Sequence, residues 1–166
     1  MNRDIFINKV EASGIIAFDL IDFKPAIEIV EFDIKDYLYM EMIVKEKEFR
    51  ASVSQIDFTS FKDKAVAIIC SVDVIIPPWV YMVLAEKLHN NAAYFDFKDT
   101  TSVEVDLWKK NLADADLSSF ADHKVVVRAR PDMPPGVYML ATDRLKPLVK
   151  ALMYGEIGMP KVIFKN

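Results

Sequence analysis

The sequence predicts an α/β fold in which a mainly parallel or mixed sheet is flanked by helices and built from two tandem βαβα-type repeats. An α+β arrangement is the alternative. The first observation is an internal repeat, in which residues 56–73 and 77–88 return as 115–132 and 134–145. The two copies share 12 identities in 30 aligned pairs, against about two expected for unrelated segments. The second is that strand-like and helix-like segments alternate, which is typical of a parallel sheet with helical crossovers.

The first copy is expected to open with a strand at 28–36, which ends in the motif Phe-Asp-x-Lys-Asp. The same motif ends residues 93–99, so we expect a strand there to open the second copy. Helices are expected next, at 44–54 and 103–112. Glu46 and Arg50 lie one helical turn apart in the first of them and can form an ion pair.

Buried strands are expected at 65–70 and 124–128, because both are near-continuous apolar runs. Each is followed by a double proline, which suits the first turn of a helix because the N–H groups of that turn have no partner within the helix. Helices should therefore start near Pro77 and Pro134. In the first, the apolar residues Val80, Val83, Leu84 and Leu88 form one stripe.

Three more strands are expected outside the repeat, at 14–20, 151–154 and 162–164. A length of 166 residues suits a single domain with one core, and no linker or shift in composition divides the chain. The predicted organisation is one domain over 1–166. Its parts are an N-terminal extension (1–26), the first copy (27–92), the second copy (93–150) and C-terminal strands (151–166).

Composition excludes several classes of protein. The chain is 52% hydrophobic and 28% charged with a net charge of −4, which is typical of a globular protein and argues against a nucleic-acid surface. No apolar run approaches the roughly 20 residues that a membrane helix needs, and the first residues do not resemble a signal peptide. The single cysteine, Cys70, fits a reducing compartment. We therefore expect a cytoplasmic protein that binds neither nucleic acid nor membrane.

Ligands of open α/β sheets bind where the strands end and lead into helices. Here those places are the loops before Pro77 and Pro134. Asp73 and Asp132 could bind a ligand hydroxyl or act as a base, or could simply cap the following helix or its loop. The candidate ligand-binding residues are Cys70, Ser71, Asp73, Tyr81, Arg130, Asp132 and Tyr138.

Each of these residues also has a simpler interpretation. Tyr81 and Tyr138 could be packed against the sheet. Cys70 could be a nucleophile or a buried small hydrophobe. His89 and His123 lack the spacing of a metal site, and the glycines form no nucleotide-binding loop, so we predict no metal and no cofactor. Residues 37–42 could form a surface for a partner or belong to the core.

Several separated motifs resemble the bacterial domain-of-unknown-function family numbered 2480, over the whole chain. The motifs are Asn8-Lys9-Val10, Ser13-Gly14, Phe18-Asp19-Leu20 with Asp22-Phe23 and Pro25, Phe32-Asp33-Ile34-Lys35-Asp36, Lys45-Glu46-Lys47 with Phe49-Arg50, Cys70-Ser71 with Asp73, Trp79 with Tyr81-Met82, and Met153-Tyr154-Gly155-Glu156. The family has no assigned activity. Its members often lie in gene neighbourhoods for iron–sulfur cluster assembly, which is an association and not a mechanism.

The resemblance also implies cysteines at three places, of which this chain keeps only Cys70. The second place falls near Arg130 and the third near Gly158. A thiolate site needs three or four ligands, so this chain alone cannot build one.

Two functions remain. The first is a cytosolic accessory protein that binds a partner, forms a homodimer and serves iron–sulfur or thiol metabolism. The alternative is a small-molecule binder or enzyme that uses the loops around Cys70 and Asp132. Whether the protein is an enzyme is left open.

Overall fold

Two sheets, each with its own helices, organise the part of the chain that can be described. The structure is a computed structural model that describes residues 14–166, so half of the predicted extension 1–26 lies outside it. One compact unit comprises residues 26–104 and is called the continuous unit. The other comprises residues 14–25 and 105–166 of the described chain and is called the split unit.

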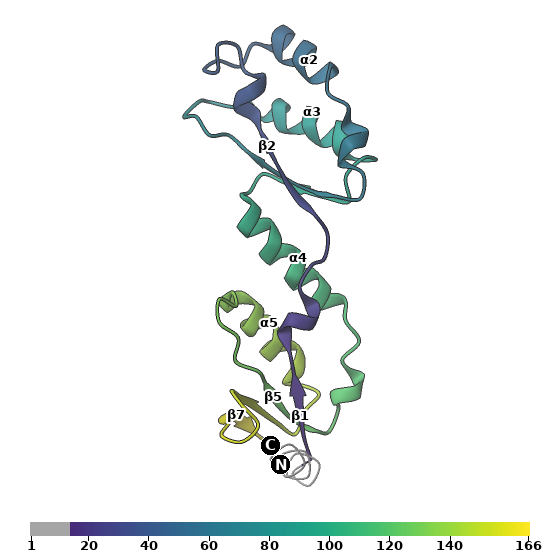
Figure 1. Ribbon diagram of the computed structural model, residues 1–166, viewed down its shortest axis with the longest axis vertical. Coiled ribbons are helices and arrows are strands. Elements are labelled where there is room, and N and C mark those ends of the chain that lie inside the picture. The colour runs from purple at the N-terminus through teal and green to yellow at the C-terminus, as the bar shows by residue number, and fades with distance from the viewer. Residues whose placement is uncertain (1–13) are drawn as a thin grey trace, which may run out of the picture. The chain divides into compact units, whose positions relative to one another are not determined.

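The continuous unit is a three-stranded parallel sheet in the order β2-β3-β4 (Figure 1). Both of its helices pack on one face of the sheet, where Phe49 and Leu84 meet Val66 and Ile68 in a buried cluster. Its elements are β2 (Ile29–Asp33), α2 (Glu46–Ser54), β3 (Ala65–Ile69), α3 (Pro78–Leu88) and β4 (Tyr94–Asp96).

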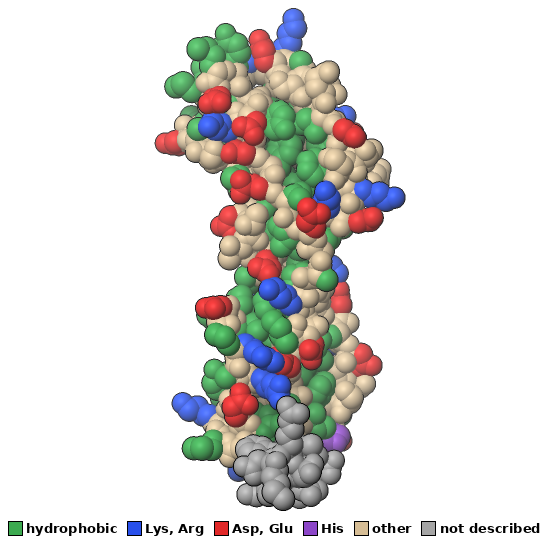
Figure 2. All heavy atoms as spheres, in the orientation of Figure 1, with side chains coloured by type: hydrophobic (Ala, Val, Ile, Leu, Met, Phe, Trp, Pro, Cys, Tyr) green, Lys and Arg blue, Asp and Glu red, His purple; other side chains and the backbone are tan. Residues whose placement is uncertain are grey.

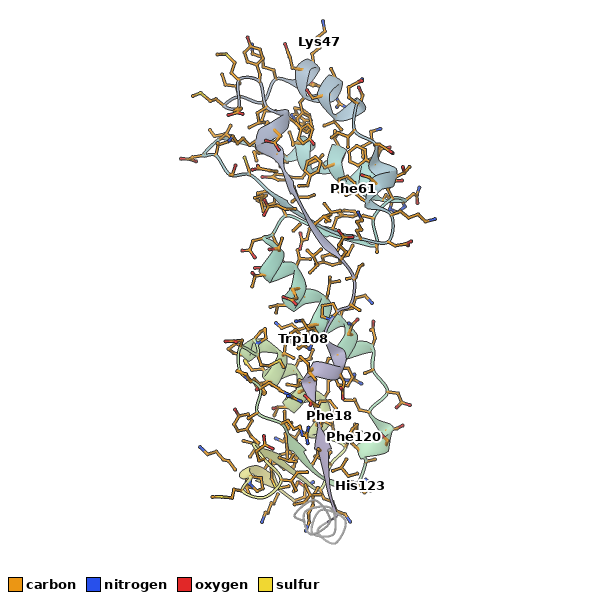
Figure 3. The ribbon with its side chains drawn as sticks, viewed as in Figure 1. Phe18, Lys47, Phe61, Trp108, Phe120 and His123 are labelled. Atoms are coloured by element: carbon orange, nitrogen blue, oxygen red, sulfur yellow. The ribbon has the colours of Figure 1, made fainter. Side chains whose placement is uncertain are left out.

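The split unit is a four-stranded sheet in the order β1-β5-β6-β7, parallel except for β7. Phe18 meets Phe120 edge to face at 5.0 Å, and Trp108 joins the same buried cluster (Figure 3). Its elements are β1 (Ile15–Phe18), α4 (Thr100–Asp114), β5 (Lys124–Val127), α5 (Pro135–Leu145), β6 (Ala151–Tyr154) and β7 (Lys161–Lys165). The boundary between the units falls inside α4, after Glu104.

Two side chains attach α4 to the rest of the split unit. The indole N–H of Trp108 donates to the carbonyl oxygen of Leu20 at 2.9 Å. Arg144 of α5 donates to carbonyl oxygens at the C-terminal end of α4, including that of Ala113 at 2.7 Å. Carbonyl groups in the last turn of a helix have no partner within it, so the guanidinium supplies the missing donor.

The α/β class predicted from the sequence is confirmed, and the strands, the two helices after the double prolines and the Glu46–Arg50 pair at 3.0 Å all form. The units even share local features at equivalent places. Asp57 and Asp116 each accept a hydrogen bond from the N–H two residues further on. Asp63 and Asp122 both take left-handed φ angles, of 60° and 62°.

The tandem arrangement of the repeat is not confirmed. Residues 93–99 were expected to open the second copy, but Tyr94 of β4 pairs with Ala65 of β3 in the continuous unit. The short connection after α3 returns the chain beside β3, as a parallel crossover requires. In the split unit it is β1, expected outside the repeat, that pairs with β5.

The single core expected from the chain length is divided into two clusters, one per unit. One domain over 1–166 stays a prediction, because compactness does not decide whether the units unfold together. Within residues 14–166, no helix has the length and apolar character to cross a membrane.

Candidate functional site

An aspartate lies at the C-terminal end of the first strand of each sheet. Asp19 follows β1 and accepts a hydrogen bond from the N–H of Ile21 at 3.2 Å. Asp33 ends β2 and accepts one from the N–H of Lys35 at 3.0 Å. Each carboxylate caps a short 3-10 turn, and such side-chain acceptors favour a turn over further strand. Both carboxylates are thereby held at the C-terminal edge of their sheet.

In the split unit, Arg130 forms a two-pronged ion pair with Asp19. The guanidinium Nε donates to Oδ1 at 3.0 Å, and Nη2 donates to Oδ2. Arg128 adds a second positive charge, with its Nη1 3.7 Å from Oδ2 of Asp19. Only 14% of the Asp19 side chain is exposed. The pair ties the loop after β5 to the end of β1, across 111 residues of sequence.

Tyr138 of α5 holds the same loop from the other side. Its phenolic oxygen accepts a hydrogen bond from the backbone N–H of Arg130 at 3.1 Å and lies 3.3 Å from the Arg130 carbonyl oxygen, to which it can donate. Its ring meets that of Tyr154, at the end of β6, edge to face at 5.7 Å. A cavity of about 230 Å³ is lined by Val127, Tyr138, Thr142, Leu152, Met153, Tyr154 and Ile163.

The continuous unit has an equivalent aspartate and an equivalent pair of aromatic rings, but no arginine at the aspartate. Asp33 Oδ1 accepts a hydrogen bond from the backbone N–H of Ser71 at 3.1 Å. Tyr81 of α3 meets Phe97, after β4, edge to face at 5.0 Å. The Cys70 thiol is half-buried and donates to the carbonyl oxygen of Val72 at 3.4 Å. A carbonyl oxygen cannot take the thiol proton, so this contact does not activate Cys70 as a nucleophile.

The predicted site residues therefore fall into two groups. Cys70, Ser71, Asp73 and Tyr81 belong to the continuous unit, and Arg130, Asp132 and Tyr138 belong to the split unit.

The helix-capping role considered for the two loop aspartates is wrong, whereas a role in capping their own loops stays a prediction. The residues that begin the helices are Pro77 and Pro134, and neither α3 nor α5 has a side-chain cap. The fixed φ of proline suits this boundary by itself, so Asp73 and Asp132 are not needed there.

Sequence reasoning missed Asp19 and Asp33, although a signal for them exists. The pattern Phe-Asp-[Leu/Ile]-x-Asp followed by an aromatic residue occurs at 18–23 and again at 32–37. The similarity of 32–36 to 95–99 is less informative. There the matching Asp96 ends β4 and accepts a hydrogen bond from the N–H of the next residue, Phe97, at 2.8 Å. Tyr154 and Phe97 were missed because their partners lie on helices that follow different strands.

Hydrogen bonds and charge shift the pKa values of these groups. The Arg130 guanidinium lowers the pKa of Asp19, against an opposing effect of burial. For Asp33, burial raises the pKa, but hydrogen bonds from Ser71 and Lys35 outweigh it and the net shift is downward. The pKa of Tyr154 is raised, first by the neighbouring Tyr138 and then by burial. Both carboxylates are thus stabilised as anions, which suits positions that hold the loops in place.

Within residues 14–166, no three or more His, Cys, Asp or Glu side chains cluster in a way that could hold a metal ion. The groups that do converge at the strand ends are hydrogen-bonded carboxylates, guanidinium groups and aromatic rings. Their contacts fasten loops to strands.

The family described as "Protein of unknown function (DUF2480)" matches residues 4–166. The match covers nearly the whole chain, as the resemblance of the separated motifs implied. The chain matches none of the curated proteins and none of the solved structures.

Proposed function

This chain belongs to the DUF2480 family, whose description gives no activity, and we propose that it acts as an accessory protein that binds another protein. The contact would be made by a small hairpin of the continuous unit, residues 39–43. Its ends are joined by a hydrogen bond from the N–H of Tyr39 to the carbonyl oxygen of Ile43 at 2.9 Å. Between them, Met40 is 73% exposed and Met42 is 70% exposed.

The conformation of this hairpin carries the proposal. Met40 and Glu41 both have left-handed φ angles, of 52° and 58°, and the N–H of Met42 donates to the carbonyl oxygen of Tyr39 at 3.2 Å. Such turns favour Asn-Gly, and each side chain other than glycine costs on the order of 1 kcal/mol there. A strained turn that exposes two methionines lowers the stability of the folded chain. It suits a surface that binds, because methionine adapts to apolar partners.

The segment around the hairpin divides between core and surface. Tyr37 stacks on Phe32 at 4.9 Å, and Leu38 is buried. Met40 and Met42 are not, and hydrophobic side chains are visible at the surface beside α2 (Figure 2). Within residues 37–42, Tyr37 and Leu38 therefore support the core interpretation, and Met40 and Met42 support the partner interpretation.

Two other apolar residues of the continuous unit are strongly exposed. Ile75 lies in the loop after β3 and is 92% exposed, and Met82 in α3 is 71% exposed. Residues 26–104 contain fourteen Asp and Glu against eight Lys and Arg. The expected partner therefore offers apolar pockets for Met40 and Met42 within a basic surface.

The cytosolic and bacterial setting, the homodimer and the link to iron–sulfur or thiol metabolism belong to the same proposal. The lone Cys70 supports a reducing compartment. The metabolic link is supported by the family resemblance alone. It does not require Cys70 as a ligand, and the thiol is engaged with its own loop.

A second candidate function is binding of a small molecule in the split unit. The cavity beside Tyr138 and Tyr154 supports it. Its volume of about 230 Å³ is below that of pockets for drug-sized ligands, so only a compact and largely apolar group would fit. Soaking the protein in small aromatic or aliphatic fragments, with chemical shifts of both tyrosines as the readout, tests this candidate.

The partner proposal is tested by a photo-cross-linking amino acid placed at Met40 of the full chain in its native cells. We expect one cross-linked protein, identified by mass spectrometry and reconstituted with the purified chain. The same group at Glu86, an exposed residue near the end of α3, should not give that product. Identical products from both positions would contradict the proposal. Cross-links from Met40 to a second copy of the chain alone would contradict it too, because they would make the hairpin the homodimer contact and not the contact with another protein.

The turn itself gives a prediction in which stability and binding move in opposite directions. Met40→Asn with Glu41→Gly should raise the free energy of unfolding by about 1 kcal/mol, because both residues suit left-handed φ angles. The same change removes one apolar contact and should weaken affinity for the cross-linked partner at least tenfold. Urea unfolding and titration with the purified partner measure the two effects. Unchanged affinity would show that the hairpin is not the contact.

A further inference from the structure

Among residues 14–166, strand β7 forms one edge of the split unit's sheet and is bonded to a single neighbouring strand, β6 (Figure 1). Val162 and Ile163 lie side by side in it, 48% and 51% exposed. An edge strand presents a row of backbone N–H and C=O groups that can pair with another strand. Exposed apolar residues on such an edge favour association with another chain, so they indicate a candidate binding surface.

The strand is held firmly enough to act as a template. Phe164 packs against the buried cluster of the split unit. The register shifts between Leu152 and Met153, which pair with Phe164 and Val162, so Ile163 is an extra residue. A bulge of this kind bends an edge strand. Phe164 nevertheless fixes the position of the strand while Val162 and Ile163 stay accessible.

The charges around this edge are positive. Lys161 and Lys165 end the strand and are exposed. Residues 124–166 contain eight Lys and Arg against three Asp and Glu. Lys124, Lys150 and Lys165 line one hollow together with Val162, and within the described part of the chain none of these lysines forms an ion pair.

We propose that β7 accepts an extended acidic segment of a partner protein as an added strand. Backbone hydrogen bonds would supply affinity. The bulge places Lys161 on the face of Tyr154 and Lys165 on the face of Ala151, so the two lysines would select carboxylates on opposite faces of the added strand, three residues apart. The same lysines disfavour a second copy of this chain. A second β7 strand would bring the positive ends Lys161 and Lys165 of both strands together, and like charges that meet across a strand pair are unfavourable.

This inference does not rest on the proposed function, because the hairpin at 39–43 belongs to the continuous unit and β7 to the split unit. Loss of binding at one surface leaves the other unaffected. The two proposals can therefore fail separately.

The test uses the full chain and two synthetic peptides. One has the central sequence Thr-Glu-Thr-Val-Glu-Thr, in which the two glutamates lie on opposite faces of an extended strand, and the other has lysine in place of both glutamates. At low salt, where surface charges are weakly screened, NMR titration should show the acidic peptide binding at least tenfold more tightly. The amide signals of residues 161–165 should shift most, and their hydrogen exchange should slow.

Charge reversal provides the matched control. Lys161→Glu with Lys165→Glu should invert the preference between the two peptides. Lys47→Glu with Lys62→Glu changes the net charge equally, at exposed residues of the continuous unit, and should leave the preference intact. Equal binding of both peptides, no binding of either, or a dimer in light scattering that protects residues 161–165 would each overturn the proposal.

Discussion

Replacing Trp108 with alanine is expected to lower the free energy of unfolding by about 3–5 kcal/mol, the range for large aromatic residues removed from a core. The side chain is 6% exposed and belongs to the buried cluster of the split unit. It also donates to the carbonyl oxygen of Leu20 across 88 residues of sequence. The substitution therefore opens a cavity and leaves a backbone acceptor without its partner.

Trp108→Phe separates these two effects. It keeps most of the ring volume and removes the indole N–H, so the expected loss is about 1–3 kcal/mol, the cost of a buried group left unsatisfied. Urea unfolding followed by far-UV circular dichroism measures both variants. If Trp108→Ala lowers the free energy of unfolding no more than Trp108→Phe does, packing of the ring does not hold α4 in the split unit.

Either substitution of Trp108 also tests the prediction of a single domain. Trp79 is then the only tryptophan, and it lies in the continuous unit. Its fluorescence reports that unit, whereas circular dichroism reports both. A single domain over 1–166 predicts coincident transitions. Separate transitions would show that the two units are independent folding domains.

Asp19→Ala is expected to destabilise the protein by about 1–2 kcal/mol, because hydrogen bonds to charged groups contribute more than neutral ones. The figure is set at the lower end because the Arg130 side chain is 37% exposed, and water takes over part of its hydrogen bonding. Asp33→Ala is the matched control. This variant loses two hydrogen bonds from backbone N–H groups but leaves no arginine without its partner. We therefore expect a smaller loss of stability, of about 1 kcal/mol.

The ion pair also makes stability depend on pH. The folded-state pKa of Asp19 lies below its ordinary value of 3.8. The unfolded chain therefore takes up the proton first, and the stabilisation is present above that value and lost as pH falls through the lowered pKa. Asp19→Asn should flatten the acid side of the stability profile, measured by urea midpoints below about pH 6. An unchanged profile would contradict this role for Asp19.

Local chemistry was enough to predict most elements. Proline pairs mark where α3 and α5 begin, because the ring fixes φ and needs no N–H partner. The apolar run of Ala65–Ile69 predicts a buried strand wherever that strand pairs. The Glu46–Arg50 pair follows from helical spacing alone. These features depend on residues within a few positions of one another, so the sequence contains them directly.

The candidate sites were predicted only in part, for the same reason. Tyr138 was predicted because it lies one turn into a helix that follows a buried strand, and Arg130 and Ser71 because they lie in loops after such strands. Their partner carboxylates were not, since Asp19 and Arg130 are 111 residues apart. The exposure of Met40 and Met42 was left open, because an apolar side chain in an irregular segment suits a core or a surface equally well.

By itself the sequence determined the α/β class, the helices and strands, the internal similarity and the lone thiol. The tertiary structure decided that the strands form two sheets, that β1 pairs with β5 and that β4 pairs with β3. The physical reason is that the residues of a short apolar strand do not specify which other strand it pairs with. Which strands pair is set by crossover length and by which faces can be buried together, and both depend on the folded chain.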